Sequence, residues 1–336
     1  MKKMKLFSIM LIGSVLLMAC GTNEDETNNQ AEDDVTTEEN TPTETSEEEL
    51  QSGEIALTHV EYLSGELGQR IAASETEEEA GQYVKDQFEQ LGYETEVQPF
   101  TYEKDEESFD SKNIIAFKEG QSEQSIIVGA HFDSVSEGLG VDDNASGVGV
   151  MLEAAERLKD IETPYSIIFI GFGAEEVGLK GSNHYVSEMS AKEVEQTVGM
   201  INLDSLVSGD KMYVHGSAGE NSFIRDLALD LAIEHDLDIE INPGLNADYP
   251  EGTTGDWSDH AAFNAAGIPY AYFEATNWEI GDLDGYTQTE EHGSFWHTEN
   301  DTLEVINDKF PGRVEERLAS FSTLLTELLL ALEEAE

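Results

Sequence analysis

The sequence predicts an α/β fold built on one mostly parallel, mixed sheet with helices on both of its faces. Three short apolar runs, at residues 126–130, 167–172 and 198–203, have the length and branched side chains of buried strands. Segments with helical periodicity separate these runs. Strands that alternate with helices in this way build parallel sheets, so the three runs are expected to lie side by side.

The other elements follow in chain order. Ser74 and Glu77 have the spacing of a capping box, which predicts a helix that ends before Gly92. Residues 93–100 alternate like a half-buried strand and are expected to pair with a strand at 113–117. The remaining expected elements are helices at 146–159, 182–188, 221–235, 259–266 and 313–332, an edge strand at 211–215 and a buried strand at 269–273.

The first 52 residues are expected to lie outside the fold. Three lysines precede an apolar run that ends before Cys20, and this predicts a signal peptide over residues 1–19. Cys20 is the single cysteine, and its context resembles the bacterial lipoprotein signal, in which the cysteine is lipidated. A secretory peptide with an incidental cysteine is the alternative. Residues 20–52 contain twelve acids and no basic residue, which predicts a disordered tether.

The expected domain therefore spans residues 53–336, without disulfides, and is held outside the cytoplasm by a lipid anchor. It contains 60 acidic and 14 basic residues, a net charge of −46. That charge excludes a nucleic-acid-binding protein, and contact with the membrane is expected only through the anchor. Such acidity is also known from salt-adapted proteins, so we expect a high-salt or alkaline habitat. An acidic surface without that meaning is the alternative.

Chemically active side chains follow each of the three apolar runs. His131 and Asp133 come at the end of the first, Glu175 and Glu176 follow the second, and Asp204 follows the third. Because the carboxyl ends of parallel strands meet at one edge of a sheet, these side chains are expected to form one site.

Two further residues complete a predicted metal centre. Asp143 lies just before the helix at 146, and His297 lies in the long loop 275–302. Imidazoles and carboxylates suit zinc, with manganese or cobalt as substitutes. Two metal ions need a bridging carboxylate and terminal ligands on both sides. The five ligands available for such a pair are His131, Asp143, Glu176, Asp204 and His297. Adjacent residues after a strand point in different directions, so Glu176 can bind a metal ion while Glu175 faces the reacting water. Glu175 is therefore the expected general base.

An ordered set of motifs resembles the zinc aminopeptidases of peptidase family M28 over roughly residues 54–336. The motifs are GAHFDS, VDDNASG, GFGAEEVGLKGS, NLDS, SDHAAF followed by GIP, and HTENDT. The resemblance implies a single-domain zinc-peptidase fold with two zinc ions. It assigns His131 and Asp204 to one zinc, Glu176 and His297 to the other, and Asp143 to the bridge between them.

The resemblance also implies supporting roles. Glu175 becomes the general base, Asp133 orients His131, and Asp259 is expected to orient His297. We interpret Asp142, beside the bridge, as structural. The interval from 100 to 125 is too short for the inserted protease-associated domain that some members carry.

The segments FEATNWEIGDLDGYTQ and FWHTENDT resemble the branch named for alkaline phosphatase isozyme conversion, whose members remove an N-terminal arginine. Many relatives have tyrosine immediately before the last histidine, where it stabilises the tetrahedral intermediate. Trp296 stands there in this chain, and its N–H donates a hydrogen bond but cannot ionise. Tyr286 or Trp278 is the expected substitute, and polarisation of the carbonyl by zinc alone is the alternative.

These features predict an aminopeptidase that acts on the N-termini of peptides or proteins and prefers basic residues. Acids in the long loops 242–258 and 275–302 are candidates to face a cationic side chain: Asp248, Asp256, Glu274, Glu279, Asp282 and Asp284. Three alternatives remain at this point. Two are other zinc chemistries on the same fold, glutaminyl cyclisation and carboxypeptidase action, and the third is a non-catalytic binding lipoprotein.

Overall fold

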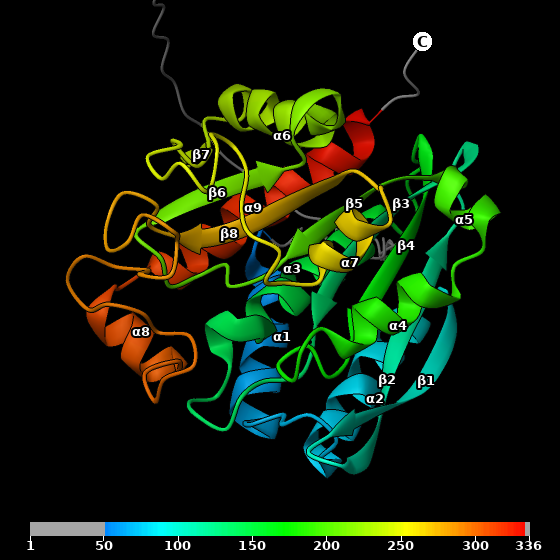
Figure 1. Ribbon diagram of the computed structural model, residues 1–336, viewed down its shortest axis with the longest axis horizontal. Helices are drawn as coiled ribbons and strands as arrows, with labels where there is room; N and C mark the ends of the chain where they lie inside the picture. Colours follow the sequence, from blue (N-terminus) through cyan, green and yellow to red (C-terminus); the bar gives the residue numbers. More distant parts are fainter. Residues whose placement is uncertain (1–50, 333–336) are drawn as a thin grey trace, which may run out of the picture. The chain divides into compact units, whose positions relative to one another are not determined.

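The computed structural model describes residues 51–332, which belong to one compact unit. The predicted signal peptide, Cys20 and nearly all of the predicted tether lie outside the described residues. One eight-stranded sheet has the order β1-β2-β4-β3-β5-β8-β6-β7 (Figure 1). Its parallel centre consists of β4 (Tyr165–Phe172), β3 (Ser122–His131), β5 (Thr197–Leu203) and β8 (Tyr270–Thr276).

Antiparallel strands flank this centre. On one side lies the hairpin of β1 (Glu94–Lys104) and β2 (Glu107–Lys118), and β2 pairs with β4. On the other side β6 (Lys211–Gly216) pairs with β8. The prediction that 211–215 forms the edge strand is wrong, because the two-residue strand β7 (Ile239–Glu240) pairs with the outer side of β6. The predicted class, a mostly parallel mixed sheet in one α/β domain, is confirmed.

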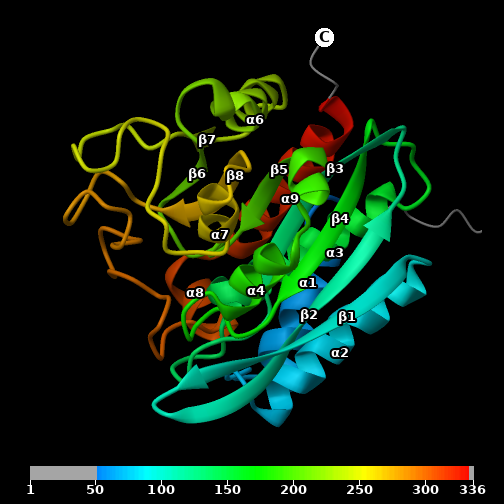
Figure 2. The same ribbon diagram turned by 45° about the vertical axis from the view of Figure 1, so that its right-hand side comes forward.

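Helices cover both faces of the sheet (Figures 1 and 2). One face packs against α1 (Glu54–Glu61), α2 (Glu75–Gln90), α3 (Ser146–Leu158), α6 (Phe223–Glu234), α8 (Leu303–Lys309) and α9 (Arg313–Ala331). The other face packs against α4 (Lys180–Glu188), α5 (Ala191–Gln196) and α7 (His260–Ala265). Side chains alternate between the two faces along a strand. Ile126 and Val128 of β3 accordingly join the first core, and Ile127 joins the second.

Four elements were not predicted from the sequence: α1, the π-helical turn Tyr62–Leu67 that follows it, α5 and α8. Helix α1 begins at Glu54, and the residue at its N-cap, Gly53, has no side chain to cap it. The carboxylate of Glu153 on α3 accepts hydrogen bonds from the amides of Gly53 and Ala56 instead. The cap therefore comes from a residue about a hundred positions away, where no local pattern can show it.

The predicted capping box at α2 forms only in part. Ser74 accepts a hydrogen bond from the Glu77 amide, as expected. The Glu77 carboxylate instead turns inward, where it accepts hydrogen bonds from the Ser111 hydroxyl at 2.7 Å and the Ala174 amide at 2.9 Å. Helix α2 is thereby fastened to the residue that precedes Glu175.

Between residues 51 and 332, no helix combines the length and the apolar character needed to cross a membrane.

Candidate metal centre

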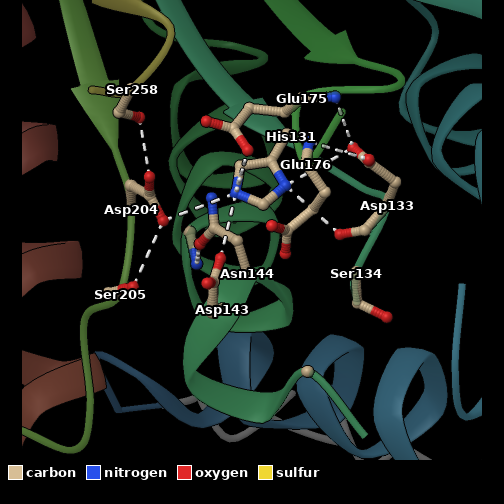
Figure 3. A network of polar contacts seen from close by, with 12 residues as sticks. His131, Asp133, Ser134, Asp143, Asn144, Glu175, Glu176, Asp204, Ser205 and Ser258 are labelled. Carbon is tan, nitrogen blue, oxygen red and sulfur yellow. Dashed lines mark hydrogen bonds and ion pairs between the residues drawn. The ribbon is translucent and has the colours of Figure 1, made fainter. Parts of the chain in front are cut away.

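The predicted metal-binding residues meet at the carboxyl edge of the parallel strands, and Figure 3 shows four of them, His131, Asp143, Glu176 and Asp204. His131 is the last residue of β3, and Asp204 directly follows β5. Glu175 and Glu176 lie in the turn after β4, and Asp143 lies just before α3. His297 comes from the loop between β8 and α8.

Asp143 faces both imidazoles. Its Oδ1 lies 3.1 Å from Nε2 of His131, and its Oδ2 lies 3.1 Å from Nε2 of His297. Asp204 Oδ1 is 3.5 Å from the same nitrogen of His131, and Glu176 Oε2 is 2.8 Å from that of His297. Two half-sites, one with His131 and Asp204 and one with His297 and Glu176, thus share Asp143. The structure brings the five expected ligands together in this arrangement.

Glu175 and Glu176 point in different directions, as expected for neighbours after a strand. Glu176 faces His297, whereas Glu175 Oε2 lies 3.9 Å from Nε2 of His131. Glu175, His131 and Asp204 also lie close enough together to hold a single ion. Glu175 therefore lies at the His131 half-site, where its carboxylate either coordinates an ion or lies next to one.

The electrostatics of the cluster fit a divalent cation. Burial lowers the pKa of His131, but the surrounding carboxylates, Glu175 and Asp204 foremost, outweigh it and raise that pKa well above its usual value. Burial raises the pKa of Glu175 well above its usual value and that of Glu176 to about 7. The carboxylates of the cluster therefore favour a positive charge among them, which a proton on the imidazole or a bound metal ion can supply.

Two buried ligand atoms have no hydrogen bond in the described part of the chain, Nε2 of His131 and Oε1 of Glu176. Neutral imidazole nitrogens and carboxylate oxygens are the donors that zinc accepts, so the residues present fit that ion.

Asp133 connects the end of β3 with the turn after β4. Its side chain lies 3.5 Å from Nδ1 of His131, and its carbonyl oxygen lies 3.2 Å from that nitrogen. Its carboxylate also accepts hydrogen bonds from the amides of Glu175, at 3.0 Å, and Glu176, at 3.2 Å. The expected contact with His131 is present, and the two amide contacts were not foreseen. One carboxylate thereby holds three members of the cluster.

The position of Asp259 corrects an expectation. This residue was expected to orient His297, but its buried carboxylate lies on the other half-site. Burial raises the pKa of Asp259 to about 7, and the neighbours that act on it include His131, Asp204 and Ser182. No contact with His297 is found among the described residues. The reason is geometric, because Asp259 precedes α7, which packs on the α4 side of the sheet.

Asp301 secures the backbone of the shared carboxylate. Its carboxylate accepts hydrogen bonds from the amides of Asp142, at 2.7 Å, and Asp143, at 3.2 Å. Asp142 in turn accepts hydrogen bonds from the amides of Val207 and Ser208, consistent with its interpretation as structural. This role of Asp301 was not predicted, although the residue belongs to the HTENDT motif.

A cavity of about 320 Å³ opens onto the cluster. Its walls come from both long loops: Trp257 from the first, and Tyr286, Ser294 and Trp296 from the second. A hollow of about 450 Å³ elsewhere on the sheet has no histidine in its lining, so the smaller cavity is the candidate substrate site.

The cavity separates the proposed substitutes for the missing tyrosine. Tyr286 and Trp296 line it, and their ring centroids are 5.4 Å apart. Trp278 does not line it, because this side chain is buried and donates its N–H to Glu274. Trp278 is therefore excluded as a direct contact for substrate.

None of the six candidate acids of the long loops lines this cavity. Glu274 is buried 2.9 Å from Nε2 of His215, and Glu279 is paired with Lys211 at 2.8 Å. Both are thus engaged within the protein. Asp248, Asp256 and Asp282 are exposed.

The fold and this donor set together define the class of metal-dependent α/β enzymes. The model of the protein family described as Peptidase family M28 matches residues 113–322 of this chain. The alkaline phosphatase isozyme conversion protein of Escherichia coli strain K12 is 34% identical over 316 residues, covering 84% of this chain and 91% of that protein. The chain therefore belongs to peptidase family M28, and the predicted family is confirmed.

Other members are longer than this chain. Aminopeptidase YwaD of Bacillus subtilis is 34% identical over 223 residues, which cover 64% of this chain and 43% of that protein. This chain therefore matches less than half of that relative.

Two solved structures show the shared fold. BSAP, a zinc aminopeptidase from Bacillus subtilis, has a TM-score of 0.68 at 19% identity and covers 85% of this chain and 97% of its own. A glutaminyl cyclase from Porphyromonas gingivalis has a TM-score of 0.64 at 21% identity, with 83% and 98% covered. One fold thus serves a peptidase and a cyclase, so the site has to identify the reaction.

Proposed function

We propose that this chain is a di-zinc aminopeptidase that removes N-terminal residues from peptides or proteins outside the cytoplasm. The observation that carries the proposal is the position of Asp143, which presents one carboxylate oxygen to His131 and the other to His297, each at 3.1 Å. A bridging carboxylate between two half-sites is what a pair of metal ions requires. His131 with Asp204, and His297 with Glu176, are the terminal ligands.

When bound, zinc ions would bind the free α-amine of the substrate and would polarise the scissile carbonyl and the attacking water. Glu175 accepts a proton from that water and later gives it to the leaving amine, as a general base and then a general acid. Asp133 fixes the backbone of Glu175 and so directs its carboxylate. The peptide bond breaks, and the products are a free amino acid and a shortened peptide.

Tyr286 is the proposed donor to the oxygen of the tetrahedral intermediate. It lines the cavity, and burial raises the pKa of its hydroxyl, so the proton is present at neutral pH. Trp296 lies beside Tyr286 and lines the cavity, and we assign it no part in donating to the intermediate. The tyrosine that many relatives have immediately before the last histidine is thus supplied from elsewhere on the same loop.

A preference for basic N-terminal residues is the finer part of the proposal. The homologous Escherichia coli protein is named for converting alkaline phosphatase isozymes. The resemblance of the motifs to that branch implies removal of an N-terminal arginine. The cavity offers aromatic faces at Trp257 and Trp296, and a guanidinium or ammonium group is attracted to such faces. Because no loop acid lines the cavity, these faces are the part of its wall suited to a cation.

The deciding experiment is a panel of aminoacyl-nitroanilides with and without a chelator. Arginyl and lysyl substrates should be hydrolysed faster than leucyl ones, and chelation should abolish turnover until zinc is returned. An N-terminal glutaminyl peptide tests cyclase action, and a peptide with a blocked N-terminus tests carboxypeptidase action. Metal content by mass spectrometry, with manganese and cobalt as replacements, tests the ions. A protein that binds zinc but hydrolyses nothing would support a binding lipoprotein.

The anchoring at Cys20 is a separate part of the proposal, which rests on the lipoprotein-like signal. Labelled palmitate should be incorporated into the full chain in a bacterial host but not into Cys20→Ser. Equal labelling of the two proteins would exclude lipidation at Cys20.

A further inference from the structure

A buried guanidinium lies beneath the candidate metal centre. Arg70 is fully buried, yet it makes no ion pair with any described carboxylate. Its side chain instead donates five hydrogen bonds of 2.8 to 3.1 Å to backbone carbonyl oxygens. The acceptors belong to Leu63, Gly68, Phe132, Leu139 and Gly140. A buried charge without a contacting counter-ion is expensive, so a residue of this kind calls for an explanation.

The hydrogen bonds of Arg70 secure the loop that joins two of the proposed ligands. Phe132 directly follows His131, and Gly140 lies three residues before Asp143. The backbone of Arg70 is also bonded to this loop, since its amide donates to the Ser134 hydroxyl at 2.9 Å and its carbonyl accepts from the Ser134 amide at 3.1 Å. The loop therefore wraps around Arg70 from end to end.

Gly140 shows how closely the loop approaches the guanidinium. Its φ is +61°, and a Cβ atom built there would lie 2.7 Å from Nη2 of Arg70. On its far side the same loop is held by Asp301, whose carbonyl oxygen accepts from the Leu139 amide at 2.8 Å. Arg70 and Asp301 thus fix the approach to Asp143 from two directions.

Arg70 also contributes charge. Burial lowers the pKa of Arg70 to about 10, and the carboxylates of Asp301, Asp133, Asp143 and Glu176 oppose this lowering. The side chain is therefore a cation at neutral pH. It attracts the same carboxylates that repel one another in the cluster above it.

We propose that Arg70 is a positioning residue of the metal centre, which sets the affinity for zinc by fixing the loop between His131 and Asp143 and by offsetting the repulsion among the carboxylates. This inference rests on the proposed metal centre. Arg70 itself lies too deep to contact substrate, and the cavity lining does not include it.

The test compares Arg70→Lys and Arg70→Met with Arg317→Met in the full chain. Arg317 is a matched control, because it is also buried and also donates to a backbone carbonyl, that of Asp210, which belongs neither to a proposed ligand nor to the loop that Arg70 holds. Zinc affinity is measured by competition with a chromophoric chelator, and the melting temperature is measured on zinc-free protein.

Arg70→Lys keeps the charge but loses the branched donor, and should weaken zinc binding about 10- to 100-fold, the usual effect of removing an outer partner of a metal site. Arg70→Met should weaken it at least as much. Arg317→Met should lower the melting temperature without changing zinc affinity.

Unchanged zinc affinity in Arg70→Lys, or an equal loss in Arg317→Met, overturns the proposal. If Arg70→Met does not fold, Arg70→Lys decides. Should the unaltered protein bind no zinc, the proposed function fails first, and the role of Arg70 fails with it.

Discussion

Ser258 donates a hydrogen bond of 2.6 Å to Oδ2 of Asp204. Asn202 donates in turn to the Ser258 hydroxyl at 2.8 Å, so the direction of that hydroxyl is fixed. The other oxygen of Asp204, Oδ1, is left facing His131. Ser258 therefore selects which carboxylate oxygen is presented to a metal ion.

Replacing Ser258 with alanine should weaken zinc binding about tenfold, because Asp204 loses the partner that orients it. Activity should return when zinc is added in excess. Ser208→Ala is the matched control, since the Ser208 hydroxyl is buried but has no hydrogen-bond partner among the described residues. Equal zinc affinities in the two variants would contradict the assigned role. Chelator competition gives the measurement.

Changing each of the two neighbouring glutamates to glutamine should have a different effect, on kcat for Glu175 and on zinc binding for Glu176. Glu175→Gln keeps the shape and removes the proton acceptor, so zinc should stay bound while kcat falls by about 10²- to 10⁴-fold. Glu176→Gln should weaken zinc at the His297 half-site, and part of its activity should return with added metal. The measurement is zinc stoichiometry beside kcat for both. Zinc loss in Glu175→Gln, with normal turnover per bound pair, would reverse the assignment.

Tyr286→Phe should lower kcat by about 10²-fold if its hydroxyl stabilises the tetrahedral intermediate, the cost typical of losing one such donor. KM should change little. Trp296→Phe is the control, because it removes the neighbouring N–H but keeps an aromatic wall. A larger fall of kcat in Trp296→Phe would move the role to the indole.

Part of the site follows directly from the sequence. His131, Glu175 and Asp204 come just after apolar runs, and parallel strands bring their carboxyl ends to one edge, so spacing alone predicts their meeting. The contact of Ser258 with Asp204 joins residues 54 positions apart, and that of Asp133 with Glu175 joins residues 42 positions apart. Such contacts carry no periodic signal, because they depend on how loops pack.

The same limit explains the errors in the fold. β7 has only two residues, too few to show a pattern of alternation. Asp259 was expected at the wrong half-site, because the sequence does not show on which side of the cluster its loop passes. Arg70 was overlooked, since a single arginine beside a turn is usually exposed, whereas its burial here depends on the loop that closes over it.

Acid should destabilise the fold through His59. Burial lowers the pKa of His59 to about 4 in the folded protein, while an unfolded histidine takes up a proton near 6.5. The unfolded state therefore binds more protons between these values, and stability falls as the pH drops through this window. The loss due to His59 should be about 2 kcal/mol between pH 7 and pH 5.

Urea unfolding of zinc-free protein at the two pH values measures this loss. His59→Gln should reduce the difference, because glutamine takes up no proton in this pH range. It can still bond to the hydroxyl of Tyr83, which lies 2.7 Å from Nδ1 of His59. His235→Gln, a change at an exposed histidine, should leave it as in the unaltered protein. A pH dependence that is the same in all three proteins would contradict the assignment.

Salt should stabilise the domain. With a net charge of −46 over residues 53–336, its acids repel one another, and the Debye length falls from about 10 Å at 0.1 M to about 3 Å at 1 M. The melting temperature of zinc-free protein should therefore rise with NaCl through this range. A flat or falling curve would show that the acids are compensated locally, and that the habitat expected from the acidity lacks support.

The shared carboxylate is secured from the far end of the chain. Asp301 bonds to the amides of Asp142 and Asp143 across 159 and 158 positions, and the second imidazole, that of His297, lies only four residues before it. A polypeptide still emerging from the ribosome can present His131 and Asp204, but not His297 or the carboxylate that holds Asp143. Loading of the proposed metal pair would thus wait for completion of the chain, and a truncated product that ended before residue 297 would have only one half-site to fill.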